Sequence, residues 1–217
     1  MNLLLLGFSA LQSANAEPRE YQVNHNASEL YVTVYKDNST LMSGFAHNHA
    51  IMAKNWTSSI VWDPEDATAC KISISLPVKD MVVDSDHARE QAAIREPNEE
   101  IKKGFLKGIS ESDRKKVRKN MLSKGQLNAD TYSTITFEST SCTDSNISGS
   151  FTMRGKSNDI SMPIRLKQAP NNDAWTLSIK GSFPVKATQY GFKPYSDLGG
   201  AVANQDKMIV HVKIRAK

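Results

Sequence analysis

Alternation of apolar and polar residues with a period of two is the feature that most constrains how this chain folds. It runs through residues 21–77 and returns from residue 134 to the C-terminus, in short stretches that end at turn-forming or strand-breaking residues. Leu30 and Val32, for example, flank the more polar Tyr31. Successive side chains of a strand point to opposite faces, so these stretches predict about ten short strands, each with one buried face.

Residues 84–125 differ in kind, because they are rich in charged and helix-forming residues and poor in β-branched ones. Ser110 and Asp113 resemble the two ends of a helix capping box, and Gly125 is placed to follow the last helical turn. Strands and helices do not alternate along the chain, so a parallel sheet is not expected. We therefore predict an all-β fold, in which an antiparallel sheet forms a barrel or a sandwich and carries one helical insertion.

The positive charge of the chain is local. The sequence has 27 Lys and Arg against 23 Asp and Glu, a formal net charge of +4. Eight of the basic residues lie between Lys102 and Lys119, inside the helical stretch. So small a surplus does not make nucleic acid an expected partner. The basic segment is interpreted as a solvated helix face, and the alternative is a surface that binds anionic lipid headgroups or an acidic partner.

The first residues of the chain have the character of an export signal. An uncharged apolar run from Leu3 to Phe8 precedes a small-residue pattern that ends at Ala16 and is typical of a cleavage site. The run is far shorter than the roughly 20 residues that span a bilayer. No Lys or Arg precedes it, which is a departure from the usual pattern. We expect residues 1–16 to be a signal peptide cleaved after Ala16, and residues 17–217 to form one periplasmic domain.

Two cysteines, Cys70 and Cys142, are too few for a disulfide scaffold, a structural zinc cluster or an iron–sulfur site. An oxidising compartment permits them to form one bridge. Cys70 shares the apolar face of Ile72, whereas Cys142 has the opposite parity to Phe137, so both cysteines can face the same way only across a β-bulge. The sequence leaves a structural Cys70–Cys142 disulfide open.

His47 and His49 are two residues apart in a predicted strand, on the face that also carries Phe45 and Ile51. Three interpretations remain: hydrogen-bonded residues of an interior, polar contacts to a ligand headgroup, or part of a metal site. A catalytic zinc usually has three protein ligands, and neither an H-E-x-x-H motif nor an acidic ligand at a recognisable spacing accompanies the pair. We therefore expect no metal and no cofactor.

No sequence motif indicates catalysis. The chain lacks a G-x-S-x-G nucleophile elbow, a P-loop and a dinucleotide-binding glycine fingerprint. Acidic pairs such as Glu99-Glu100 lie in the charged helical stretch, where a solvated helix face explains them better than acid–base chemistry. His211 shares the polar face of its predicted strand with Lys213 and is expected at the surface. We do not expect an enzyme.

Several blocks of residues, taken in order, resemble the YceI-like family. The blocks are Tyr21-Gln22-Val23, Ser43-Gly44-Phe45-Ala46-His47-Asn48-His49-Ala50-Ile51, Trp62-Asp63-Pro64, Ile135-Thr136-Phe137-Glu138-Ser139-Thr140, Ile147-Ser148-Gly149-Ser150-Phe151-Thr152-Met153-Arg154-Gly155 and Tyr190-Gly191-Phe192-Lys193-Pro194-Tyr195. Each block is short, but their order extends over nearly the whole of residues 17–217. Two departures concern ligand identity more than fold: Arg154 stands where many relatives have His, and Gln189 replaces an acidic residue.

The resemblance implies a lipocalin-like antiparallel β-barrel that holds an isoprenoid (polyprenyl or quinone-like) or another amphiphilic lipid, for transport, storage or sequestration. Combined with strand parity, it predicts polar contacts from His47 and His49 and a cavity wall made of Phe45, Ile51, Ile72, Ile74, Phe137, Phe151, Met162 and Ile164. One alternative is a barrel packed solid by the same side chains. Two others are a metal-binding protein built on the two histidines and a module that binds anionic surfaces through residues 102–119.

Overall fold

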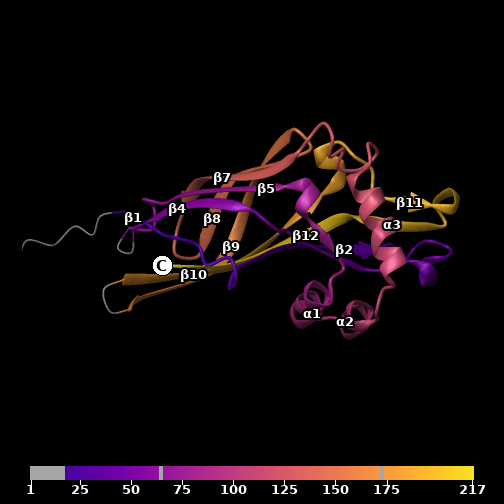
Figure 1. Cartoon of the computed structure of the whole chain (residues 1–217), viewed down its shortest axis with the longest axis horizontal. Helices are drawn as coiled ribbons and strands as arrows, with labels where there is room; N and C mark the ends of the chain where they lie inside the picture. The colour runs from indigo at the N-terminus through magenta and orange to yellow at the C-terminus, as the bar shows by residue number, and fades with distance from the viewer. Residues whose placement is uncertain (1–17, 64–65, 172–173) are drawn as a thin grey trace, which may run out of the picture.

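The computed structural model describes residues 18–63, 66–171 and 174–217 (Figure 1). The predicted signal peptide, residues 1–16, lies outside the described residues. The strands are β1 (Arg19–Glu20), β2 (Glu29–Lys36), β3 (His49–Met52), β4 (Thr57–Trp62), β5 (Lys71–Pro77), β6 (Val82–Val83), β7 (Thr134–Cys142), β8 (Asn146–Met153), β9 (Lys156–Asn171), β10 (Ala174–Lys186), β11 (Ser196–Asp197) and β12 (Val202–Ala216). The α-helices are α1 (Asp86–Arg95), α2 (Glu99–Leu106) and α3 (Glu111–Leu122).

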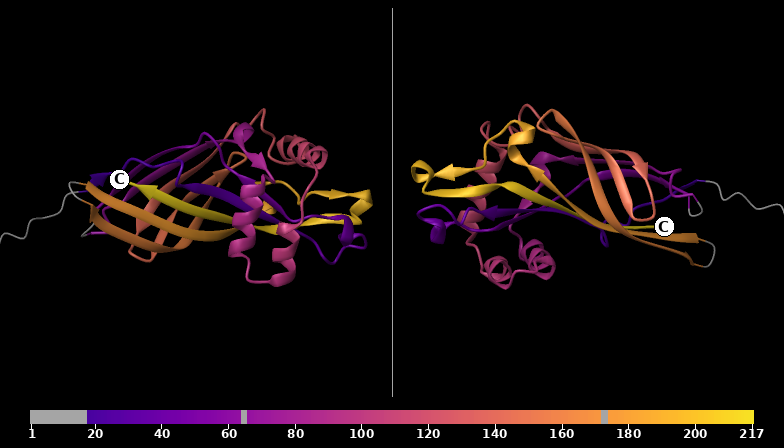
Figure 2. Two further views of the ribbon diagram at one scale, coloured as in Figure 1. Left: turned by 60° about the horizontal axis from the view of Figure 1, so that its bottom comes forward. Right: turned by 180° about the vertical axis from the view of Figure 1, so that it is seen from behind.

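In the described residues, twelve strands form one curled sheet with the order β1-β4-β5-β7-β8-β9-β10-β12-β2-β3-β6, and β11 pairs with β12. Each strand pair in this sheet is antiparallel. Figure 2 shows the sheet curling around a long axis, with the helices at one end. The prediction of an antiparallel barrel-like sheet with one helical insertion is confirmed. No helix in the described part of the chain is long and apolar enough to span a bilayer.

The N-terminal segment closes the curled sheet at one end. β1 pairs with β4, and the N–H of Tyr21 then donates to the carbonyl oxygen of Ile60 at 2.8 Å. The next residue, Gln22, switches sides and donates to the carbonyl oxygen of Lys217 at 2.8 Å, beyond the end of β12. Segment 19–24 therefore joins the β4 edge to the β12 edge by backbone hydrogen bonds, which satisfies polar groups that a free edge would expose.

Burial follows the predicted parity where the outer face of the sheet meets water. Along β8, buried residues alternate with partly exposed ones. In β3, however, all four residues are buried, because α1 and α2 cover the outer face there (Figure 1). Ala50 and Met52 pack outward against Ala88, Ala92 and Phe105 of these helices. The same layer of helices packs on Tyr31 of β2, whose hydroxyl donates to the carbonyl oxygen of Gln91 in α1 at 3.2 Å.

The prediction for His211 was wrong, because the outer face of the sheet is covered in this region. The sequence placed it at the surface, but its side chain lies under α1 and is only 8% exposed. Its ring stacks on Tyr31 with the centroids 4.5 Å apart, and Nε2 lies 3.1 Å from the hydroxyl of Thr33. Burial, followed by the positive charge of Arg95, lowers the pKa of His211 to about 4. The imidazole is therefore neutral at pH 7 and serves the packing of this layer.

Each helix of the insertion begins at a side chain that accepts a backbone hydrogen bond. Ser85 caps α1, Asn98 caps α2 and Ser110 caps α3, where its hydroxyl oxygen accepts from the N–H of Asp113 at 3.1 Å. Asp113 accepts from the Ser110 hydroxyl at 2.7 Å. Asp is one methylene shorter than the Glu of a standard capping box, and here it binds the hydroxyl of the capping residue.

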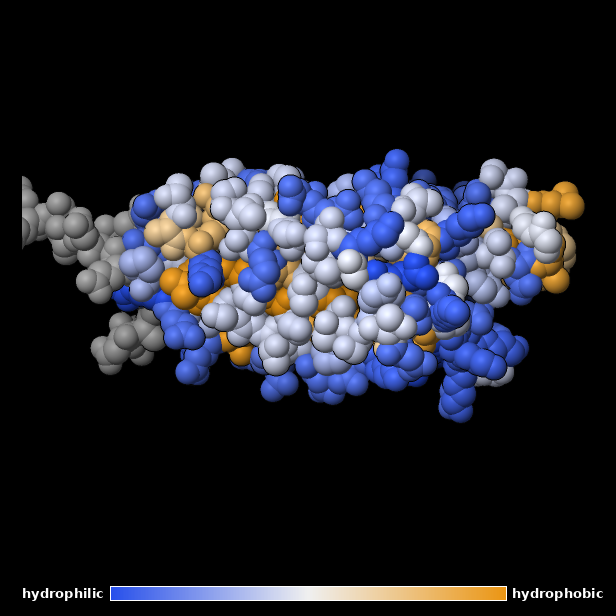
Figure 3. Space-filling model, turned by 90° about the horizontal axis from the view of Figure 1, so that it is seen from above, coloured by the Kyte–Doolittle hydropathy of each residue, from blue (hydrophilic) through white to orange (hydrophobic). Residues whose placement is uncertain are grey.

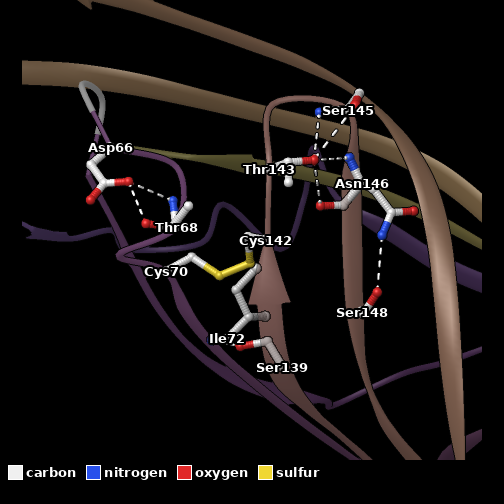
Figure 4. The surroundings of a disulfide bond; sticks show 10 residues. All are labelled: Asp66, Thr68, Cys70, Ile72, Ser139, Cys142, Thr143, Ser145, Asn146 and Ser148. Atoms are coloured by element: carbon white, nitrogen blue, oxygen red, sulfur yellow. Dashed lines mark hydrogen bonds between the residues drawn. A yellow bond between two sulfur atoms is a disulfide. The ribbon is translucent and has the colours of Figure 1, made fainter.

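A disulfide joins Cys70 to Cys142, with their Cα atoms 6.0 Å apart (Figure 4). The bulge that parity requires is present, because the register of β7 against β8 shifts between Ser139 and Ser141. Beside this shift, the Ser139 hydroxyl oxygen accepts a hydrogen bond from the backbone N–H of Ile72 at 2.8 Å. The bulge turns Cys142 toward the interior, where it is 2% exposed, and the serine replaces the ladder hydrogen bond lost there.

Opening the disulfide should destabilise the fold without unfolding it. The bridge closes a sequence separation of 72 residues, so the Cys70→Ser/Cys142→Ser variant should lose about 2–4 kcal/mol of unfolding free energy. Urea denaturation measures this loss, and wild-type protein in reductant should match the double variant. An unreduced protein with two titratable thiols, or a midpoint unaffected by reductant, contradicts the bridge.

Candidate functional site

The interior of the barrel contains an apolar cavity of about 190 Å³ near the α3 end. A smaller cavity of about 60 Å³ lies deeper between the two sides of the sheet. Leu30, Leu76, Ile135, Phe151 and Val210 line both of them. The two cavities are therefore neighbours that share part of one apolar wall.

The polar groups of the larger cavity lie mainly at its α3 end. Among the described residues, no Asp, Glu, Lys or Arg lines either cavity. The larger cavity is lined instead by the neutral amides of Asn120, Gln126, Asn204 and Gln205. Because Gln205 is exposed to solvent while Ile135 is buried, the cavity opens at the α3 end and is enclosed further in. We call residues 120, 126, 194–195 and 204–205 the mouth.

The structure brings most of the predicted wall together. Ile51 and Phe151 line the larger cavity, and Phe151 also lines the smaller one. The other wall residues around the smaller cavity are Ile72, Ile74, Phe137 and Met162. Ile164 is buried in the same core but lines neither cavity. Strand parity therefore locates the interior face well along β5, β7, β8 and β9.

Phe45 and His47 do not lie where the sequence predicts them. Residues Ser43–Phe45 form a 3-10 turn in which the N–H of Ala46 donates back to the Ser43 carbonyl oxygen, so β3 begins only at His49. The turn frees Phe45 from the strand parity, and its side chain is 73% exposed. His47 is partly buried and lines neither cavity.

His49 lines the larger cavity and belongs to a buried ionic cluster that sequence reasoning missed. Its Nδ1 lies 2.7 Å from Oδ2 of Asp84, which is fully buried. The other oxygen of Asp84 accepts from the Ala50 N–H at 2.9 Å and from Nη1 of Arg89 at 2.9 Å. With Nδ1 engaged by Asp84, Nε2 is the ring nitrogen of His49 left for the cavity. Asp84 and Arg89 fall in the stretch 84–125, which the sequence predicted only to be charged and helical, and no local signal marked them as buried.

Arg89 joins three segments of the chain. Nη1 also donates to the Asn48 carbonyl oxygen at 2.8 Å, and Nη2 donates to the carbonyl oxygens of Gly104 and Lys107 at 2.7 and 2.9 Å. The guanidinium therefore ties α1 to the start of β3 and to the end of α2. A charge pair with this many hydrogen bonds tolerates burial, although Nε of Arg89 has no partner among the described residues, whereas removal of Asp84 or Arg89 leaves an unpaired charge.

The balance of interactions at Asp84 keeps its carboxyl ionised. Burial on its own raises the pKa of Asp84, but the hydrogen bond and charge of His49, the Ala50 N–H and the charge of Arg89 together outweigh burial and leave the pKa lowered. At His47, burial lowers the pKa of the imidazole, and the nearby charges of His49, Lys107 and Arg89 lower it further.

The arrangement gives a metal no third ligand. In the chain as described, no three His, Cys, Asp or Glu side chains are grouped so that they could hold an ion. The rings of His47 and His49 are 6.4 Å apart between centroids, and Asp84 already binds His49 and Arg89. The chemistry available at the mouth is hydrogen bonding by neutral groups next to a long apolar wall.

The Asp84→Asn variant should lose about 3 kcal/mol of unfolding free energy near neutral pH, because Arg89 then stays buried without its counter-charge. Since the folded pKa of Asp84 is lowered, its stabilisation is fully present above the unfolded pKa of about 3.9 and is lost as the pH falls through the folded value. The variant should therefore lose less stability than wild type on acidification.

Urea denaturation at neutral and at acidic pH tests this expectation. The control is Asp130→Asn, which removes a carboxylate that is also paired, with Lys79, but is 89% exposed. The control should stay close to wild type. Equal effects of the two variants would show that burial of Asp84 does not govern the result.

Comparisons with known proteins agree with the fold. The crystal structure of Burkholderia cenocepacia BcnA superposes with a TM-score of 0.61 at 15% identity and covers 90% of this chain and 100% of that chain. That of the Campylobacter jejuni YCEI protein gives 0.53 at 13% identity, with 76% and 82% covered. No curated protein matches the sequence significantly. The model of the YceI-like domain matches residues 21–216, and the chain therefore belongs to the YceI-like family.

Proposed function

We propose that this protein binds a neutral amphiphilic lipid of the isoprenoid class in its barrel, for transport, storage or sequestration, without covalent chemistry. The observation that carries the proposal is the apolar interior, made of two adjacent cavities that share lining residues, with side-chain amides gathered toward its open end. Burial of a hydrocarbon tail gains about 0.8 kcal/mol for each CH₂ unit, so a long chain supplies the affinity. The polar groups at the mouth would then fix the orientation of the headgroup.

The interior is adaptable enough for a tail larger than the present cavity. Five of the chain's eight methionines line the two cavities: Met81, Met121, Met153, Met162 and Met208. Methionine side chains are unbranched and change conformation readily, so they can move aside for an isoprenoid chain and refill the space when it leaves. A lining of this kind favours the binding of several ligands of similar shape rather than of one specific molecule.

The absence of Asp, Glu, Lys and Arg from the described lining selects among headgroups. A carboxylate or phosphate drawn inside the cavity, away from the exposed lysines at its rim, would lie among neutral amides and apolar side chains, and an unpaired buried charge is costly. The carbonyl oxygens of a quinone need only hydrogen-bond donors, and an alcohol needs a donor or an acceptor; the side-chain amides at the mouth supply both. We therefore favour a quinone-like or polyprenyl alcohol ligand over a fatty acid.

The proposed location is the periplasm. A disulfide persists in an oxidising compartment, and Cys70–Cys142 is bridged. This agrees with the export signal expected in residues 1–16, which lie outside the described structure.

Native mass spectrometry of protein exported in its host and purified without detergent tests the ligand class. We expect an added mass that denaturation releases into the organic phase, and delipidated protein should bind a long-chain quinone more tightly than a fatty acid of similar length. A protein that is empty and binds neither compound contradicts the proposal. Tighter binding of the fatty acid contradicts the neutral headgroup.

Filling the cavity should abolish binding without unfolding the barrel. Ala53 is a small residue of the larger cavity wall, and Ala53→Phe should lower quinone affinity at least about tenfold by occupying the space of the tail. Ala169→Phe makes the same change at an exposed position of β9 and should bind as wild type. Fluorescence titration with a quinone measures both, and unchanged binding by Ala53→Phe would place the ligand elsewhere.

A further inference from the structure

Two loops form a tip at the end of the barrel opposite the C-terminus (Figure 1). We define the tip loops as residues 37–46, between β2 and β3, and residues 198–203, which include the first two residues of β12. The N–H of Met42 donates to the Ala201 carbonyl oxygen at 2.9 Å, and the N–H of Asp37 donates to the Ala203 carbonyl oxygen at 2.8 Å. The two loops therefore lie side by side.

The tip loops expose large apolar side chains to solvent. Leu41 is 92% exposed, Phe45 73% and Leu198 61%, and these are three of the five most exposed large hydrophobic residues in the described chain. Figure 3 shows apolar atoms protruding at this end of the molecule next to polar surface, and a second apolar stretch along the barrel. A cluster of this kind on a soluble domain marks a contact surface.

The backbone holds these side chains outward. Leu198 has φ of 50°, a left-handed conformation that is rare for a bulky residue, and Gly199 and Gly200 continue it with φ of 65° and 95°. A Cβ placed on Gly44, Gly199 or Gly200 would meet no atom within 4 Å, so the loops project into open space. The apolar residues therefore project from two neighbouring loops that reach into solvent.

The cavity opens beside the tip. Asn204 and Gln205 line the mouth directly after the second tip loop, and the Asn204 N–H donates to the Tyr195 carbonyl oxygen at 2.9 Å. The side chain of Gln205 donates to the carbonyl oxygen of Lys36, directly before the first tip loop, at 3.1 Å. A surface that covers the tip would thus lie against the mouth.

Exposed cations accompany the mouth. Lys119, Lys124 and Lys193 are exposed and lie one or two positions from the mouth residues Asn120, Gln126 and Pro194. None of the three forms an ion pair with any residue in the described ranges.

Several other cations of the basic segment 102–119 are paired. Lys102 binds Glu99, Lys115 binds Glu111 and Lys116 binds Asp113. The unpaired cations near the mouth complement an anionic surface better than the segment as a whole.

We propose that the tip loops dock the barrel on a bilayer that contains anionic phospholipid. Leu41, Phe45 and Leu198 insert among the acyl chains, and the three lysines lie over the phosphates. A few apolar side chains at the ends of projecting loops suit insertion into a fluid interface, whereas a protein partner of standard size needs a surface of about 800 Å². Docking also sets the mouth against the bilayer, so a lipid could pass into the barrel without crossing water. That last consequence rests on the proposed function, and the docking itself does not.

Vesicle co-sedimentation tests the docking directly. Wild-type protein should bind phosphatidylcholine vesicles that contain phosphatidylglycerol, and added salt should weaken the binding. The Leu41→Ser/Phe45→Ser/Leu198→Ser variant should bind at least about tenfold more weakly, because the apolar area inserted is lost. Ile94→Ser is the matched control, since Ile94 is 66% exposed but lies on α1, outside the tip loops, and it should bind as wild type.

A second variant separates charge from insertion. Lys119→Glu/Lys124→Glu/Lys193→Glu should lose the preference for phosphatidylglycerol over pure phosphatidylcholine, while it keeps the weak binding that the apolar residues supply. Unchanged preference for the anionic vesicles would overturn the assignment of these lysines to the docking surface.

Two further readouts distinguish failure of the docking from failure of the proposed function. Native mass spectrometry should show that the serine variant still carries lipid in solution, and size-exclusion chromatography should show the same mass as wild type. Wild-type protein that carries lipid but ignores the vesicles overturns the docking and leaves the proposed function standing. Vesicle binding by a protein that binds no lipid in its barrel overturns the proposed function and leaves the docking standing. A wild-type dimer abolished by the serine substitutions would make the tip a contact between copies and overturn the docking.

Discussion

The structure depends on a barrel-like sheet that is closed at one end and open at the other. At the closed end, segment 19–24 bridges the β4 and β12 edges by backbone hydrogen bonds, and the Cys70–Cys142 disulfide fixes β5 to β7. Hydrogen bonds and a covalent bond therefore hold the apolar interior shut where no ligand needs to pass. At the open end, the amides of Asn120 and Gln205 border the interior, and an elongated molecule can have its tail in the barrel and its head at the mouth.

The helical insertion is coupled to the cavity wall through one buried ionic cluster. Asp84 binds His49 of the wall and Arg89 of α1, and Arg89 reaches the end of α2. The cost of burying these charges is offset only because nearly every polar group of the cluster finds a partner. The same helices cover the outer face of β3, while α3 contributes Val117 and Asn120 to the cavity. The insertion thus shapes the open end of the barrel as well as its outer layer.

Sequence patterns predicted the strands, the helical stretch and the interior face. They could do so because apolar and polar residues must alternate along the strands of a sheet that has one face in water. They showed by parity that a Cys70–Cys142 bridge requires a bulge, but they left the bridge itself open. They failed at β3 and His211, because the outer face of the sheet is also buried there and residues on both faces are then inaccessible to water. They also failed at Phe45, where a 3-10 turn interrupts an alternation that continues in the letters. The mouth was out of reach, because its amides come from α3, the following loop and β12 and meet only in three dimensions.

The central claim is that the interior holds the tail of a neutral amphiphile with its headgroup at the mouth. A crystal structure of the protein in complex with a long-chain isoprenoid quinone tests it most directly. The account predicts continuous density from the space beside Ile72 and Phe137 to the mouth, with the quinone oxygens within hydrogen-bond distance of Asn120, Gln126, Asn204 or Gln205. A quinone bound on the outer surface, or one bound with its ring at the closed end, would contradict the account.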